Sequence, residues 1–361
     1  MKAVVSTGET DPLTTIKNLS IPQITDDQIL IKSHSFAINP TDWKALKRNR
    51  EKDIVVGSDV SGKVEEVGSN VKEFKKGDYI SSFVTGNISK TNSAFAEYVA
   101  VSPKVSIKYD HLVKDPSNSD YLKSGRITTF DGAASVSLGL VTVALAYSYS
   151  LKIKENKKPN DFILIWGGST ATGILAIQLA KLVFDLKVVT TASPKNHEFL
   201  KSLGADYVFD YNDENVVDKI KETANGNLHF ALDTIAEPET FQKVYDSTSN
   251  TSGKIFLDSL LFLDSNSIKL DPNRDNNLIH YGKTLASFVL IKEKRFGDLL
   301  LKAPEDINEY YDPFWFEILP KYIGQLKHAN LRILPDGFQS VNEGFSLSKK
   351  GVSNEKLVFS I

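Results

Sequence analysis

The chain has 361 residues, which can build one large core or two domain cores, and its content of 41% hydrophobic and 24% charged residues is ordinary for a globular protein. The net charge of -2 gives no electrostatic reason to expect nucleic acid or an anionic membrane as a partner, and no uninterrupted apolar run approaches the roughly 20 residues that cross a bilayer. The absence of cysteine excludes disulfides, a Cys nucleophile and thiolate zinc sites. No secretory leader is evident, so we expect a cytoplasmic protein.

Short strands and turns fill the first part of the chain. Met1–Val5 resembles the start of a strand, and Val60–Val71 alternates loosely around two glycines. The Lys76–Asp78 turn precedes another apolar run, Tyr79–Val84. Turn signals between short apolar runs predict a β-rich, barrel-like domain.

From Asp161 the pattern changes to an alternation of strands and helices. The predicted strands are Phe162–Trp166, Lys187–Thr191, Tyr207–Phe209, Phe230–Asp233 and Lys254–Leu257. Helices are predicted between them, and this order implies βαβ crossovers and a parallel sheet. A helix over Phe316–His328 and a strand over Leu357–Ile361 close the chain. If this last strand rejoins the first domain, the parallel-sheet domain is an insertion between two parts of the other one.

The first predicted strand of this series runs into a glycine-rich turn and then into an amphipathic helix. Gly168 to Gly173 match the G-x-G-x-x-G pattern, with Thr170 in place of the middle glycine. Strand, turn and helix in this order build a dinucleotide cradle, in which the backbone approaches a pyrophosphate. The candidate cofactor-binding residues are Gly167, Gly168, Ser169, Thr170, Ala171, Thr172 and Gly173. An ordinary strand-to-helix turn without a ligand is the alternative.

The end of the next strand points to NADPH. An NAD site usually places an acidic residue about 20 positions after the glycine motif, to hold the ribose 2′-hydroxyl. That position falls near Ala192, where Ser193 and Lys195 stand instead of a carboxylate. A hydroxyl and an ammonium suit a 2′-phosphate. The alternative is a Ser-Pro helix start with a solvated lysine.

Five segments, in order along the chain, resemble the medium-chain dehydrogenase/reductase superfamily in its zinc-free, quinone-oxidoreductase-like branch. They are Met1–Val5, Ile38–Lys44, Gly57–Gly62 with Val67–Val71, Ala94–Tyr98, and Trp166–Lys181 with Leu203–Asp206. Within the branch, Trp166–Gly173 and Thr191–Asn196 look most like the fungal trans-acting enoyl reductases and related yeast aldehyde and enone reductases.

This resemblance implies an α/β fold, with a Rossmann parallel-sheet domain and a GroES-like β-barrel catalytic domain. Residues 1–140 and 305–361 would form the catalytic domain, and residues 141–304 the dinucleotide-binding domain. Zinc-dependent relatives carry a ligand histidine where Ser58 stands here, so we expect no metal site. The tyrosine matching Tyr211 lies by the adenosine in related reductases.

The resemblance also suggests residues near the nicotinamide. Asp42 and Lys44 are the ionisable groups of the segment that borders it, and Thr142 matches a threonine close to it. Lys44 could bind the cofactor or polarise a substrate carbonyl. Val143 departs from the family's Leu-Thr-Ala pattern. A surface pair between Asp42 and Lys44, and a buried helical threonine, are the alternatives.

Without a Lewis acid, reduction of an electrophilic C=C or C=O is the natural chemistry. We expect hydride transfer from NADPH to a small-molecule enone, enal, quinone or aldehyde, by a monomer or homodimer with no membrane or nucleic-acid partner. Quinone reduction by a homodimer is one rival. An NADPH sensor or partner-binding protein without turnover is the rival from another class.

Overall fold

The computed structural model describes residues 1–114, 119–296 and 299–361. The chain divides into two compact units. Unit 1 comprises Met1–Val141, Ser287–Pro304 and Ile323–Ile361, and unit 2 comprises Thr142–Ala286 and Glu305–Tyr322.

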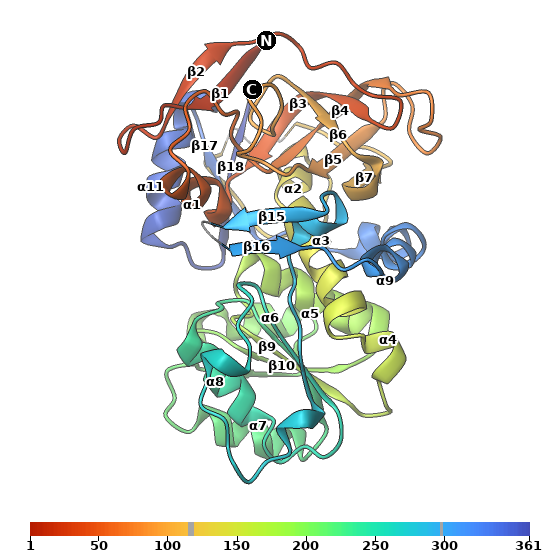
Figure 1. The fold of residues 1–361 in the computed structure, drawn as a ribbon, viewed down its shortest axis with the longest axis vertical. Helices are drawn as coiled ribbons and strands as arrows, with labels where there is room; N and C mark the ends of the chain where they lie inside the picture. The colour runs from red at the N-terminus through yellow and green to blue at the C-terminus, as the bar shows by residue number, and fades with distance from the viewer. Residues whose placement is uncertain (115–118, 297–298) are drawn as a thin grey trace. The chain divides into compact units, whose positions relative to one another are not determined.

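A curled, mostly antiparallel sheet of eight strands forms the centre of unit 1 (Figure 1). Its longest pair is β3 (Ile29–Ala37) and β4 (Asp59–Val67), whose register shifts twice, and such bulges bend and twist a sheet. The other strands are β5 (Tyr79–Phe83), β6 (Tyr98–Val101), β7 (Ser106–Tyr109), β8 (Tyr121–Leu122), β17 (Asn330–Leu334) and β18 (Glu355–Ser360). β18 pairs with β3, so the last strand does rejoin the first domain, as the sequence predicts.

Helices and two small sheets complete unit 1. They are β1 (Lys2–Ser6) with β2 (Thr14–Asn18), β15 (Glu293–Phe296) with β16 (Leu299–Lys302), α1 (Pro40–Arg48), α2 (Phe130–Ala134) and α11 (Val341–Lys350). The core contains a cluster of aromatic rings. Phe36 lies 5.9 Å from Phe95 and 4.9 Å from Phe359 between ring centroids. These rings join β3, β18 and the segment before β6, and so hold distant parts of the chain in one unit.

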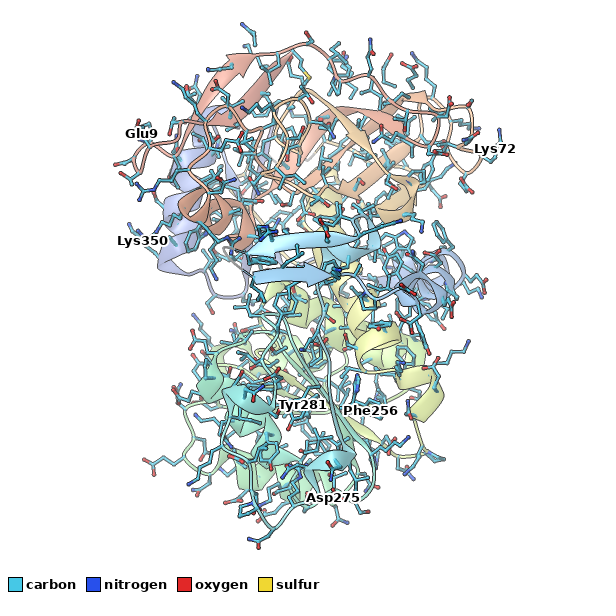
Figure 2. All side chains as sticks on the ribbon, viewed as in Figure 1. Glu9, Lys72, Phe256, Asp275, Tyr281 and Lys350 are labelled. Carbon is cyan, nitrogen blue, oxygen red and sulfur yellow. The ribbon has the colours of Figure 1, made fainter. Side chains whose placement is uncertain are left out.

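Six parallel strands form the sheet of unit 2, in the order β11-β10-β9-β12-β13-β14. They are β9 (Phe162–Trp166), β10 (Lys187–Thr191), β11 (Tyr207–Phe209), β12 (Leu228–Asp233), β13 (Ile255–Ser259) and β14 (Ile279–Tyr281). The connecting helices are α5 (Ala171–Phe184), α6 (His197–Ser202), α7 (Val216–Ala224) and α8 (Pro238–Ser247). The side chains of Phe256 and Tyr281 mark β13 and β14 in Figure 2. The predicted parallel Rossmann sheet is therefore confirmed, with β14 added at its edge.

The division into units differs from the predicted boundary near residue 304. Ser287–Pro304 belongs to unit 1, where the Arg48 guanidinium lies 4.7 Å from the centre of the Phe296 ring. Glu305–Tyr322 belongs to unit 2, because its aromatic side chains pack there. Phe314 stacks on Phe184 at 6.1 Å, for example.

One helical stretch, Phe130–Asn156, is long and apolar enough to cross a membrane by length and composition alone. It runs through α2, α3 (Ser137–Leu145), the π-helix Ala146–Ser150 and α4 (Ile153–Asn156). Of its most apolar window of 18 residues, 72% is buried inside the protein, as in a core helix.

Candidate functional site

The glycines of the turn after β9 are packed so closely that a side chain at these positions would clash with neighbouring atoms. Gly167 has a φ of +81°, in the left-handed region that favours glycine. A Cβ atom on Gly168 would lie 2.1 Å from Thr190 Oγ1, and one on Gly173 would lie 2.5 Å from the Gly167 carbonyl oxygen. The turn therefore needs glycine at these positions.

The threonine in the middle of the motif caps the helix that follows. Thr170 Oγ1 accepts a 2.9 Å hydrogen bond from the Gly173 backbone N–H at the start of α5, and it donates a 3.0 Å bond to Thr234 Oγ1. Thr234 in turn contacts the Gly167 carbonyl at 2.9 Å. This capping role explains why Thr170 replaces a glycine. The first N–H groups of a 14-residue helix, here those of Ala171 and Thr172, favour a phosphate by their dipole.

A hydroxyl pair lies where β10 and β11 end. Ser193 Oγ and Tyr211 OH are 3.0 Å apart, and Tyr211 is exposed. Lys195 is exposed on the short 3-10 helix Pro194–Asn196. The structure thus brings together Ser193 and Tyr211, which were predicted as cofactor-binding residues by separate arguments. Sequence reasoning passed over Asp210, whose carboxylate accepts 3.0 Å and 3.1 Å bonds from Asn212 in its own loop.

These groups fit a dinucleotide with a 2′-phosphate. The turn after β9 has the strand–turn–helix arrangement of a pyrophosphate cradle, and the hydroxyl pair and Lys195 carry donors and a positive charge of the kind that suits a further phosphate. No carboxylate follows β10 directly, because Ala192 stands there and donates its N–H to the Phe209 carbonyl at 3.0 Å.

Lys195→Ala is expected to weaken NADPH binding by about 1–3 kcal/mol, the usual contribution of a charge-assisted hydrogen bond, and to leave NADH binding nearly unchanged. Fluorescence titration with both cofactors measures the effect. The control is Lys201→Ala, since Lys201 pairs with Glu198 at 2.9 Å on the neighbouring α6. Equal losses for NADPH and NADH would show that Lys195 does not bind the 2′-phosphate.

In unit 1, Asp42 is fully buried at the start of α1. One of its carboxylate oxygens accepts a 2.8 Å bond from the Asn39 backbone N–H, and the other accepts a 2.7 Å bond from Ser58 Oγ. Burial raises the pKa of Asp42 to about 6. These two bonds tie Asp42 to the residues Asn39 and Ser58, so we assign Asp42 a role in positioning this part of the chain.

Lys44 and Thr142, the other two candidates, lie in different units. Lys44 is exposed on α1, with its ammonium 5.7 Å from the centre of the Trp43 ring. It is not in a surface pair with Asp42, whose carboxylate is buried. Thr142 is half-buried on α3.

A zinc centre needs several ligand side chains gathered at one point. Among the described residues, no group of three or more His, Cys, Asp or Glu side chains could hold a metal ion. Ser58, at the position of the ligand histidine, uses its hydroxyl to bond Asp42. The side chains present therefore do not fit a zinc centre.

Two family models match the chain. The model described as "Alcohol dehydrogenase GroES-like domain" matches residues 25–111, and "Zinc-binding dehydrogenase" matches residues 171–302. The chain is 32% identical to the Saccharomyces cerevisiae protein YCR102C, over 99% of both chains. It is 31% identical to trans-enoyl reductase FSL5 of Gibberella zeae, over 98% of this chain and 95% of that protein. With trans-enoyl reductase TOXD of Cochliobolus carbonum the identity is 40%, over 60% of this chain and 69% of that protein.

Solved structures share the fold. The quinone oxidoreductase of Coxiella burnetii aligns with a TM-score of 0.63 and 21% identity, over 100% of this chain and 99% of that chain. A family model for each domain, full-length relatives above 30% identity and the two sheets described above agree with one another. The chain belongs to the medium-chain dehydrogenase/reductase superfamily of oxidoreductases, close to the fungal trans-enoyl reductases.

Proposed function

We propose that this protein is an NADPH-dependent reductase that transfers hydride to a carbon–carbon double bond conjugated to a carbonyl group. The observation that carries the proposal is the arrangement at the strand ends of unit 2. There a glycine cradle stands beside a hydroxyl pair and Lys195, with no carboxylate directly after β10. The names of relatives at 31% and 40% identity support enoyl reduction within this chemistry.

The bound cofactor would supply the hydride, and the side chains would supply binding and orientation. The cradle and the α5 N-terminus would hold the pyrophosphate. Ser193, Lys195 and Tyr211 would hold the 2′-phosphate end. Lys44 and Thr142 are the polar groups that we assign to orienting the acceptor or the nicotinamide. Such preorganised donors stabilise charge that develops on the acceptor during the transfer.

Steady-state NADPH oxidation with a panel of 2-enals, enones, quinones and aldehydes tests the proposal. We expect turnover with conjugated enals or enones to exceed turnover with simple aldehydes. Turnover with quinones alone would instead favour the quinone-reductase alternative. Tight NADPH binding without turnover on any acceptor would favour a sensor or binding protein.

Thr142→Val and Lys44→Ala are each expected to lower the rate about 10- to 1000-fold, a loss of about 1–4 kcal/mol of transition-state stabilisation. Thr142→Val should change cofactor affinity less than turnover, whereas Lys44→Ala can change both. The measurements are kcat, KM and the NADPH Kd of each variant. Wild-type kcat in both variants would remove these residues from the mechanism.

A further inference from the structure

A buried ammonium group lies at the centre of a polar cluster in unit 1. Lys356, on β18, has a side chain only 10% exposed. Its Nζ donates a hydrogen bond to Asn39 Oδ1 and lies 3.8 Å from Asp59 Oδ2. Burying a charged group costs free energy unless opposite charges and hydrogen bonds surround it. These contacts therefore stabilise the buried ammonium of Lys356.

Two buried carboxylates interact with this one cation: Asp59 as its ion-pair partner, and Asp42 through the longer-range attraction between opposite charges. Asp59 is fully buried, and its oxygens accept a 2.8 Å bond from Asn39 Nδ2 and a 2.7 Å bond from the Leu138 backbone N–H. Asp42, also fully buried, accepts the bond from the Asn39 backbone described above. Burial lowers the pKa of Lys356 and raises that of Asp59.

Asn39 is the link between these charges. Its amide donates to Asp59 and accepts from Lys356, while its backbone N–H is held by Asp42. Asn39 is also the N-cap residue of α1, the helix that carries Lys44. Removing the ammonium would therefore leave Asn39 Oδ1 without this donor and free the start of α1 to move.

We propose that Lys356 is a positioning residue whose buried ammonium, shared by Asp42 and Asp59, fixes Asn39 and the first turn of α1 for the reaction. The kinetic part of this inference rests on the proposed reductase function. A role in stability alone is a poor explanation for the buried Lys356–Asp59 pair. Apolar residues can replace a buried ion pair with little loss or a gain in stability. A cluster that joins β4, β18 and the start of α1 has the geometry needed to hold one helix end in place.

The test compares three variants with the wild type. Lys356→Met leaves both carboxylates without a cation and can fail to fold. The double variant Lys356→Met/Asp59→Asn removes one charge of each sign and keeps the balance. Lys356→Arg keeps the positive charge. Lys350→Met is the matched control, since Lys350 is an exposed lysine in the last turn of α11 in the same unit (Figure 2).

Two readouts separate the inference from the proposed function. Hydrogen exchange of the first turn of α1 should become at least about 10-fold faster in the folded double variant and stay at the wild-type rate in Lys350→Met. This readout needs no turnover. With an acceptor that the wild type reduces, kcat of the double variant should fall about 10- to 100-fold with NADPH affinity within about 3-fold, and Lys356→Arg should recover part of the loss. The inference would be overturned if the folded double variant exchanged the first turn of α1 at the wild-type rate. It would also be overturned if exchange became faster but kcat stayed at the wild-type value. A wild type without turnover would count only against the reductase proposal.

Discussion

Gly173→Val is expected to weaken NADPH binding by at least about 100-fold, equivalent to about 2.7 kcal/mol. A Cβ atom at this position would already lie 2.5 Å from the Gly167 carbonyl oxygen and 2.9 Å from the Gly168 Cα atom. Both neighbours are backbone atoms of the turn, so they cannot rotate away as a side chain would. The turn must move off α5, and its close approach to a pyrophosphate is lost.

The measurement is a fluorescence titration with NADPH, after circular dichroism and thermal unfolding have shown that the variant is folded. Gly324→Val is the matched control, because a Cβ atom on Gly324 meets no heavy atom within 4 Å. Gly173→Ala introduces the smallest possible clash and should fall between the wild type and Gly173→Val. A folded Gly173→Val protein with wild-type affinity would contradict the assignment of the cradle.

The parallel sheet of unit 2 could be predicted from the sequence because its central strands are buried on both faces. The continuous apolar run Phe162–Trp166 and the β-branched run Lys187–Thr191 appear in the structure with the predicted bounds. β14 was missed, since its three residues Ile279–Tyr281 are too short to show a period. The predicted helix over Phe316–His328 is divided into π, α and 3-10 turns that end at Gln325.

The cofactor-binding end of the site could also be predicted from the sequence. Glycines in a strand-to-helix turn and the residues that end β10 are local in sequence, so a motif can reveal them. The cluster around Lys356 is not local, because Lys356 lies 317 residues from Asn39 in the chain. Asp59 stood out only as part of the Gly57–Gly62 segment, and Lys356 carried no signal that separates a buried lysine from a solvated one. Such groups become visible only when the strand pairing of β18 with β3 is known.

Asp258, at the end of β13 in unit 2, should make the stability of the protein depend on pH. Its carboxyl group is fully buried and takes part in no ion pair with the described residues. Its two oxygens accept bonds from Thr284, at 2.5 Å from the hydroxyl and 3.4 Å from the backbone N–H. The Thr284 hydroxyl lies 2.7 Å from Ser150 Oγ. Burial raises the pKa of Asp258 to about 7, well above the usual value of an aspartic acid.

The sign of the effect follows from proton binding. Between about pH 4 and pH 7 the unfolded chain has lost this proton while the folded protein still holds it, so the free energy of unfolding falls as the pH rises. Below about pH 4 Asp258 is protonated in both the folded and the unfolded chain, and its contribution to the free energy of unfolding is complete. Above about pH 7 it is ionised in both, and the loss no longer changes with pH. Asp42, with its pKa raised to about 6, acts in the same direction. The loss from Asp258 alone is up to about 4 kcal/mol, since each pKa unit corresponds to about 1.4 kcal/mol.

Asp258→Asn is therefore expected to raise the free energy of unfolding by about 2–4 kcal/mol at pH 8 and to change it little at pH 4. The amide has the shape of the protonated acid, so its oxygen can still accept from the Thr284 N–H. The Thr284 hydroxyl can turn to accept from the amide and donate to Ser150 Oγ. Urea unfolding at pH 4, 6 and 8 measures the effect, with Asp218→Asn as a control, since Asp218 is an exposed partner of Lys221 at 3.3 Å. A difference between Asp258→Asn and the wild type that is the same at all three pH values would mean that Asp258 is ionised in the folded protein throughout this range.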